Sequence, residues 1–257
     1  MALIAMAVYD TEENGRTEYT KKTLDSIWVN IEFDKHRLVI IDNNSCYETK
    51  RIFTYFKTLG LKFDLITLSE NVGTARAINM AIKLRQPNEP VVKIDNDVVI
   101  NSRDWVEEME EVLRREPKIG IVGLKRKDLC QTPWHENEDF RSYPTLLPHE
   151  PGQTWIMVEK TKDIMGTCTM LSPQLLDALG GYVQYGVYGF DDTILNLRAG
   201  LAGFEKCFLS HIEIDHLDTG DNPYSEIKRQ QAAEAWPEYH KLHLAYCSGT
   251  RPLFEEI

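Results

Sequence analysis

The chain has 257 residues, with 40 acidic and 29 basic side chains and a formal net charge of −11. Its composition is that of a globular protein with enough apolar residues to bury a substantial core. The acidic balance argues against a broad electrostatic grip on nucleic acid, which requires a basic surface. The length allows one large domain or two small ones.

The N-terminal sequence and the cysteines give no sign of export or of a membrane anchor. The apolar run MALIAMAV lacks a basic flank and is too short for a signal peptide or a membrane span, and no later stretch approaches a transmembrane helix. The five cysteines are widely spaced and form no CxxC pair, which disfavours zinc and redox motifs. We therefore expect a soluble, cytoplasmic protein with reduced thiols.

Strand and helix patterns alternate along the first half of the chain. Apolar runs bounded by turn residues predict strands over residues 3–8, 38–41, 63–68, 91–94 and 119–124. Helical spacing of apolar residues predicts the intervening helices, including one that ends at Gly60 and one that Ser102 caps. The alternation predicts an α/β fold with a mostly parallel, Rossmann-like sheet flanked by helices.

The second half is less regular. Residues 125–162 are rich in Pro, His, Glu and Trp and lack periodicity, so we expect a long irregular segment with a functional role. Residues 167–171 and 204–214 read as strands, and a short helix begins at Ser172 and Pro173. A Gly- and Tyr-rich loop over residues 182–190 precedes a helix that Asp191 and Asp192 open.

The segment VVKIDNDVVI, residues 91–100, is the most informative in the chain. Asp95 and Asp97 stand two residues apart where a strand opens into a loop, so their side chains can point the same way. We expect no Lys or Arg to pair with them. Paired carboxylates then fit a hard divalent cation, Mg²⁺ or Mn²⁺, which also takes substrate phosphates. A polar turn between two strands is the alternative interpretation.

Polar side chains also follow the first two predicted strands. Tyr9 and Asp10 come after the first strand, and Asp42 ends the second. Ligands of such sheets bind beyond the carboxyl ends of the strands, so we expect these residues to gather with Asp95 and Asp97 at one sheet edge. A local turn would also account for Asp42, because Asn and Asp favour turns.

The order of these motifs resembles family 2 of the GT-A glycosyltransferases. The resemblance covers residues 3–217 and runs through AMAVYD, VIIDNNS, ENVGTARAIN, IDND, YGFDDTILNLRAGLAGFE and HIEIDH. The chain departs from the family's pattern at two positions. Asp10 stands where the family usually has Asn, and Ile78 stands where it commonly has Arg, so that Arg76 is the nearby cation.

The resemblance implies a GT-A domain over residues 1–220, with a nucleotide-binding half at 1–124, an acceptor-side, catalytic half at 125–220 and a helical tail at 221–257. It implies that a nucleotide-sugar donor binds at Ala7, Tyr9, Asp42, Gly73, Arg76 and Asp95. It places a Mn²⁺ or Mg²⁺ ion at Asp95, Asp97 and His216. Asp192, or Asp191 as second choice, becomes the general base.

The implied activity is metal-dependent transfer of a hexosyl or pentosyl group, most simply from a UDP-sugar, to an acceptor hydroxyl with inversion. The acceptor class stays open among glycan, small molecule, protein and modified nucleic acid, and so does the oligomeric state. Simpler explanations exist for single residues. Gly73 could be a helix entry, Asp191 and Asp192 could be helix N-terminal acids, and His216 could be structural.

Three other classes of protein fit the sequence less well. A sugar nucleotidyltransferase would also carry acidic metal ligands, but it needs a Gly-rich, basic loop after the first strand, and VYDTEENGR is acidic. A dinucleotide oxidoreductase needs a GxGxxG sequence after a strand, which is missing. A non-catalytic sugar- or partner-binding module on a degenerate transferase fold is disfavoured by the retained Asp95, Asp97 and Asp192.

Overall fold

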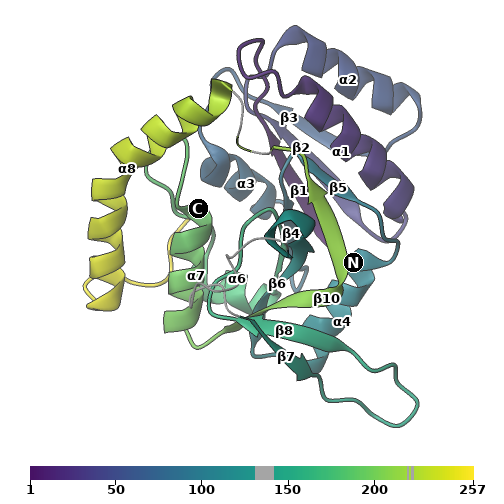
Figure 1. The fold of residues 1–257 in the computed structure, drawn as a ribbon, viewed down its shortest axis with the longest axis vertical. Helices are drawn as coiled ribbons and strands as arrows, with labels where there is room; N and C mark the ends of the chain where they lie inside the picture. Colours follow the sequence, from purple (N-terminus) through teal and green to yellow (C-terminus); the bar gives the residue numbers. More distant parts are fainter. Residues whose placement is uncertain (131–141, 219, 221–222) are drawn as a thin grey trace.

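The computed structural model describes residues 1–130, 142–218, 220 and 223–257. A single mixed sheet runs through these residues in the strand order β3-β2-β1-β4-β9-β6-β10-β8-β7, with β5 paired to β10 (Figure 1). The strands are β1 Leu3–Val8, β2 Arg37–Asp42, β3 Asp64–Thr67, β4 Val91–Ile94, β5 Val98–Ile100, β6 Ile119–Arg126, β7 Ser142–Leu146, β8 Met157–Thr161, β9 Cys168–Leu171 and β10 Glu205–His216. The helices are α1 Thr17–Asn30, α2 Tyr47–Thr58, α3 Thr74–Ile82, α4 Trp105–Arg115, α5 Lys127–Cys130, α6 Pro173–Leu179, α7 Asp191–Leu201 and α8 Pro223–Cys247.

The predicted parallel sheet is confirmed in the first half of the chain. Strands β3, β2, β1 and β4 pair in parallel, and β6 pairs with β10 in the same sense. Strand β9 lies between β4 and β6 and is antiparallel to both. The carboxyl ends of β1 and β4 therefore meet at one edge of the sheet, beside the connection that precedes β9.

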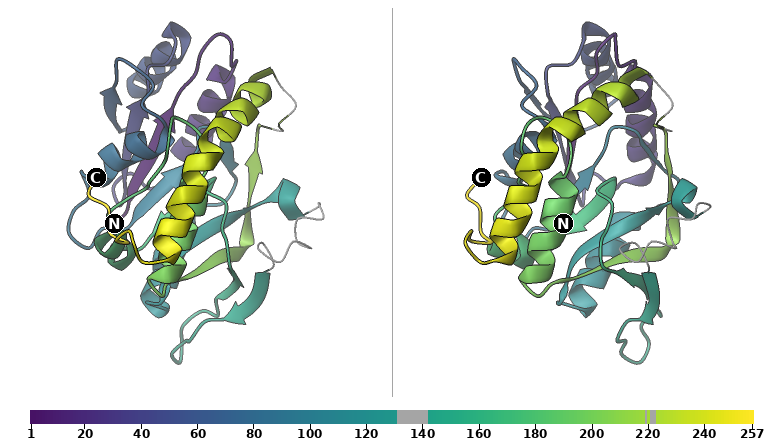
Figure 2. Two further views of the ribbon diagram at one scale, coloured as in Figure 1. Left: turned by 90° about the vertical axis from the view of Figure 1, so that its left-hand side faces the viewer. Right: turned by 60° about the vertical axis from the view of Figure 1, so that its left-hand side comes forward.

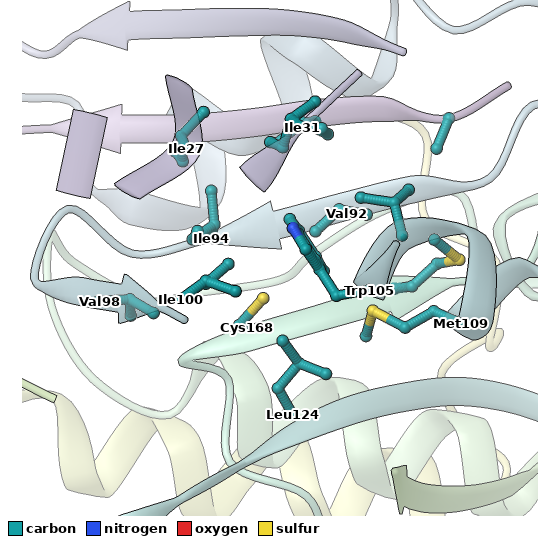
Figure 3. Packing of buried hydrophobic residues seen from close by; sticks show 14 of the residues in the cluster. Ile27, Ile31, Val92, Ile94, Val98, Ile100, Trp105, Met109, Leu124 and Cys168 are labelled. Carbon is teal, nitrogen blue, oxygen red and sulfur yellow. The ribbon is translucent and has the colours of Figure 1, made fainter. Parts of the chain in front are cut away.

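Helices cover both faces of the sheet because the strand residues alternate between two cores. Ile4 and Met6 of β1 point to the face that α1, α2 and α4 cover. Figure 3 shows this core around the fully buried Trp105 of α4. Leu3 and Ala5 point to the other face, which α3, α6 and α7 cover. Both faces of the central strands are thus buried, which explains their continuous apolar runs.

The C-terminal part of the chain is anchored on α6 and α7. Helix α8 packs along α7 (Figure 2), where the ring of Phe190 stacks on that of Tyr239 at 4.4 Å between centroids. The buried guanidinium of Arg198 donates hydrogen bonds to the carbonyl oxygens of Gly181 (2.6 Å) and Leu253 (2.6 Å). Arg198 therefore braces α7 against both neighbouring segments, as a buried cation can when backbone acceptors satisfy its fork of donors.

The structure corrects two sequence predictions. The segment 125–162, expected to be irregular, holds α5 and the antiparallel pair β7 and β8 in its described part. Ser102 does not cap α4, because the helix begins after Asp104, whose backbone is left-handed (φ 58°), and the Ser102 hydroxyl donates to the Arg103 carbonyl. In the described ranges, none of the helices combines the length and the apolar character needed to cross a membrane.

Candidate active site

A cavity of about 420 Å³ opens at the carboxyl edge of the sheet. Its wall is formed by the ends of β1, β4 and β10, the connection over residues 163–167, the loop before α7, and the first turns of α7 and α8. Of the predicted site residues, the ones that line it are Ala7, Tyr9, Asp95, Asp97, Asp191, Asp192 and His216. Asp42, Gly73 and Arg76 do not line it.

The turn that carries Asp95 and Asp97 is held from both sides. The amide of Asp95 donates to the Thr167 carbonyl at 2.9 Å, and the amide of Leu217 donates to the Asp97 carbonyl at 2.8 Å. These bonds tie the end of β4 to the connection before β9 and to the end of β10. Three segments that are far apart in sequence thereby bring His216 beside Asp97.

Asp97 is buried and lies between two cationic or ionisable partners. Its Oδ2 is 2.6 Å from Nη2 of Arg16 and 3.3 Å from Nε2 of His216. Burial acts to raise the pKa of Asp97, but the His216 ring and the Arg16 guanidinium outweigh it and hold that pKa well below its usual range. Asp97 is therefore an anion throughout the physiological pH range.

Lys93 is the corresponding partner of Asp95. Its Nζ lies 2.9 Å from Oδ1 of Asp95 and 2.6 Å from the Gly166 carbonyl, and it is almost fully buried. The expectation that no Lys or Arg pairs with Asp95 and Asp97 was wrong. Lys93 is two residues from Asp95, and β-strand geometry places side chains two residues apart on the same face.

The chemistry of the predicted metal ligands fits a divalent ion, although their atoms are not gathered. Asp97 Oδ1 and His216 Nδ1 are buried and have no hydrogen-bond partner among the described residues. A carboxylate oxygen and an imidazole nitrogen are suitable ligands for Mn²⁺. In the described part of the chain, the three-residue group with all ligand atoms within 4.8 Å is instead the partly exposed Glu32, Asp104 and Glu107.

The two acids at the start of α7 have different surroundings. Asp192 accepts hydrogen bonds from the amides of Gly166 (3.1 Å) and Thr193 (2.8 Å), one on each carboxylate oxygen. Asp191 lies 3.9 Å from the Lys93 ammonium. Burial raises the pKa of Asp191 to about 6 against the opposing effect of Lys93. Both acids face the cavity from the helix N-terminus, where a carboxylate is favoured by the macrodipole.

The predicted nucleotide-binding residues are divided between the cavity and its surroundings. Tyr9 lines the cavity beside Asn43. Asp42 is fully buried, and its Oδ1 accepts from the Ser45 amide at 2.8 Å, as in a local turn. Asp42 Oδ2 is also buried, and no described residue bonds to it. Arg76 is exposed on α3, outside the cavity wall.

Gly73 allows two backbone segments to approach each other closely. It lies at the N-terminus of α3 with φ +89°, and a Cβ there would be 2.8 Å from the Val187 Cα and 3.1 Å from the Val187 carbonyl oxygen. Val187 and its neighbour Tyr188 line the cavity. The physical reason for glycine is thus contact with the loop that shapes the cavity, rather than direct contact with a ligand.

Gly73→Ala is expected to destabilise the protein by about 1–3 kcal/mol, because it combines an unfavourable backbone conformation with a steric clash. Gly60→Ala is the matched control, since Gly60 has φ +98° but open space around its Cβ position. Chemical denaturation measures the free energy of unfolding of both variants. Gly73→Ala combines backbone strain with a steric clash, whereas Gly60→Ala has the backbone strain alone. Equal losses of stability would show that the Val187 contact is unimportant.

The sequence interpretation missed the cations of the site. Arg16 follows β1, and Lys228 lies on α8, with its ammonium near the rings of Tyr188 (5.7 Å) and Tyr224 (5.3 Å). Both line the cavity together with Lys93. Arg16 directly precedes α1, in the same β1–α1 loop as Tyr9 and Asp10. The helical pattern of the tail, in contrast, contains no signal that marks Lys228.

The comparisons with known proteins concern the family and the fold of the chain. The sequence profile described as glycosyl transferase family 2 matches residues 4–180. No curated protein matches the chain significantly. The chain is similar in structure to the mannosyltransferase PcManGT from Pyrobaculum calidifontis, solved with GDP-Man and Mn²⁺, with a TM-score of 0.66 and 18% identity over 96% of this chain and 63% of that one.

Two further solved structures share the fold. TarS from S. aureus, residues 1–349 with UDP-GlcNAc, gives a TM-score of 0.60 and 14% identity over 85% of this chain and 61% of that one. GalNAc-T7 with UDP, GalNAc and Mn²⁺ gives a TM-score of 0.60 and 11% identity over 84% of this chain and 43% of that one. The chain thus spans less than two thirds of each of these proteins. Because the family profile covers most of its length and its sheet is shared with these transferases, the chain belongs to glycosyl transferase family 2 and has the GT-A fold.

Proposed function

We propose that this chain transfers a sugar from a nucleotide-sugar donor, most simply a UDP-sugar, to an acceptor hydroxyl, with a divalent metal and with inversion at the anomeric carbon. One observation carries the proposal: Asp97, His216 and the pair Asp191 and Asp192 come from three separate parts of the chain and line one cavity. The reaction needs charge stabilisation for a diphosphate and a base for the acceptor in the same place. The similar structures with GDP-Man and UDP-GlcNAc support the donor class.

We assign the general base to Asp192. Its orientation is set by the amides of Gly166 and Thr193, and each of its oxygens keeps a lone pair for a further proton. The acceptor oxygen attacks the anomeric carbon on the face opposite the diphosphate, and Asp192 takes the hydroxyl proton as the glycosidic C–O bond breaks. Asp191, opposite Lys93, is then a charge partner at the cavity wall.

The metal would be held by Asp97 and His216, with help from Asp95. When bound, such an ion neutralises the negative charge that develops on the departing diphosphate. The chain supplies further positive charge of its own from Lys93 and Lys228, which line the same cavity. Either Mn²⁺ or Mg²⁺ would satisfy these ligands, and the Mn²⁺ in two of the similar structures favours the former.

In this proposal residues 1–124 bind the nucleotide, and residues 125–220 supply the base and one metal ligand. We assign Tyr9 to stacking on the nucleotide base and Asp42 to accepting the imino N–H of that base, which requires the buried Asp42 carboxylate to become accessible from the cavity when the nucleotide binds. The tail at residues 221–257 completes the cavity through Tyr224 and Lys228 of α8.

Asp42→Asn is expected to weaken nucleotide binding by about 10–100-fold, because a hydrogen bond to a charged group contributes about 1.5–3 kcal/mol. Asparagine keeps an oxygen for the Ser45 amide but replaces the unpartnered acceptor by a donor. Calorimetric titration with UDP and with GDP measures the effect. Asp64→Asn, at the exposed start of the neighbouring β3, is the matched control. Unchanged affinity of Asp42→Asn for both nucleotides would disprove the assignment.

The proposed activity is tested by a thermal-shift screen of UDP- and GDP-sugars in the presence of Mn²⁺, followed by assays of donor hydrolysis and transfer. A ligand that binds only the folded state raises Tm by mass action. We expect at least one donor to raise Tm when Mn²⁺ is present and to be turned over. No shift and no turnover with any of these donors would reject the proposed function.

A cytoplasmic location stays a prediction, supported by the chemistry of the thiols. Cys46, Cys168, Cys207 and Cys247 are free. Burial raises the pKa of Cys168 and of Cys207. Buried thiols of this kind are poor nucleophiles and are consistent with a reducing compartment.

A further inference from the structure

Arg16 occupies the position from which it can neutralise the central metal carboxylate. Its two terminal nitrogens reach two different acids: Nη2 is 2.6 Å from Asp97 Oδ2, and Nη1 is 2.6 Å from Asp218 Oδ2. The Arg16 side chain is 8% exposed, and those of Asp97 and Asp218 are 4% and 3% exposed. Nη2 also approaches Asn96 Oδ1 at 3.4 Å.

Charge pairing extends to the other side of the cavity. Lys93 pairs with Asp95 and approaches Asp191, and Lys228 pairs with Asp218. The acids next to the proposed metal position therefore already have cationic partners within the chain. A site that binds a free divalent ion tightly normally presents several carboxylates whose charge is not compensated. This cavity differs, although the carboxylates themselves are present.

The positive charge of Arg16 also repels a metal ion that approaches Asp97. A cation at Oδ1 of Asp97 would share one carboxylate with the guanidinium at Oδ2, in a buried setting where like charges are poorly screened. A nucleotide diphosphate brings its own negative charge to the cavity. That charge would offset the repulsion and supply the oxygen ligands that the protein lacks.

We propose that Arg16 is a positioning residue that suppresses metal binding to the free protein, so that the divalent ion binds together with the nucleotide diphosphate. The inference rests on the proposed function, since it takes the donor to be a nucleotide-sugar. Arg16 lies outside the predicted metal ligands, and its charge makes metal binding depend on the nucleotide. Metal and nucleotide should each increase the affinity of the other by the same factor.

The arrangement around Arg16 allows the side chain to be removed without leaving its partners unpaired. Asp218 keeps the ammonium of Lys228 and the amide of Gly220, which donates to Oδ1 at 3.0 Å. Asp97 keeps His216. The contact of Arg16 with the Asn96 amide oxygen is long at 3.4 Å, and the Asn96 amide nitrogen keeps its bond to Asp10 Oδ1 at 2.8 Å. We therefore expect Arg16→Gln to fold, and thermal unfolding verifies this before binding is measured.

The experiment measures Mn²⁺ affinity by calorimetry and by the electron paramagnetic resonance of free Mn²⁺, with and without saturating UDP or GDP. In Arg16→Gln, Mn²⁺ alone is expected to bind about tenfold more tightly than in the wild type, because a nearby positive charge has been removed. The factor by which the nucleotide improves Mn²⁺ binding should shrink. Arg16→Lys keeps the charge and should resemble the wild type. Arg37→Gln, which loses an ion pair with Glu89 remote from the cavity, is the matched control.

Two results would overturn the inference. One is Mn²⁺ binding to Arg16→Gln that is equal to or weaker than in the wild type. The other needs no variant: if the wild-type protein binds Mn²⁺ as tightly alone as with nucleotide, Arg16 does not suppress metal binding. Failure of the proposed function has a different signature, since UDP and GDP would then both fail to bind, while the comparison of Mn²⁺ alone in wild type and Arg16→Gln still reports on Arg16.

Discussion

Replacing Asp192 by asparagine is expected to slow sugar transfer by about 10²–10⁴-fold, the usual contribution of a general base. The substitution keeps the shape of the side chain and removes the charge that accepts the acceptor's proton. Donor affinity should change little, because the diphosphate and metal contacts involve other residues. Steady-state transfer assays and nucleotide titrations of the same preparation measure the two effects separately.

Asp191→Asn is the matched comparison, since it changes the adjacent acid at the start of the same helix. We expect it to retain more activity than Asp192→Asn, because Lys93 keeps Asp95 and the Gly166 carbonyl as partners. If Asp191→Asn loses transfer while Asp192→Asn keeps it, the roles must be exchanged. In that case the rate should fall as the pH drops below about 6, where burial has placed the pKa of Asp191, since a base must be ionised to accept a proton.

Removal of the divalent metal, or of its principal carboxylate in Asp97→Asn, is expected to reduce transfer by about 10²–10⁴-fold, since charge neutralisation of the leaving group contributes several kcal/mol. Transfer should be lost in excess EDTA and recovered when Mn²⁺ is added back. Full activity in EDTA would reject metal dependence.

The stability of Asp97→Asn separates catalysis from folding. Breaking a buried ion pair can be costly, but Arg16 keeps Asp218 as a partner, so we expect a loss of about 1–3 kcal/mol. Asp215→Asn is the matched control, because Asp215 precedes His216 on β10 and pairs with Lys127 outside the cavity. A control as inactive as Asp97→Asn would point to general disruption of this edge of the sheet.

The sequence determined most of the fold because the local pattern of most segments agrees with the environment of those segments in the folded protein. The run in β1 is apolar at each position since both faces of this strand are buried, and the strand has the predicted bounds, Leu3–Val8. Ser172 caps α6, as its place before Pro173 indicates, through a 3.1 Å bond from the Leu175 amide. The pair β7 and β8 was not predicted, because its strands are only partly buried and lack a clear alternation of apolar and polar residues.

The acids of the candidate site could be identified in the same way, because they stand directly where predicted strands end or helices begin. Their ion pairs could not. Arg16 and Asp97 are 81 residues apart in sequence, and Arg16 and Asp218 are 202 apart. Nothing local selects these partners, since the pairing depends on how the sheet edge, β10 and α8 converge around the cavity. The sequence by itself thus specified the acidic residues at this edge. Only the tertiary structure decided which cations pair with them, because Coulomb interactions depend on distance in space and on burial.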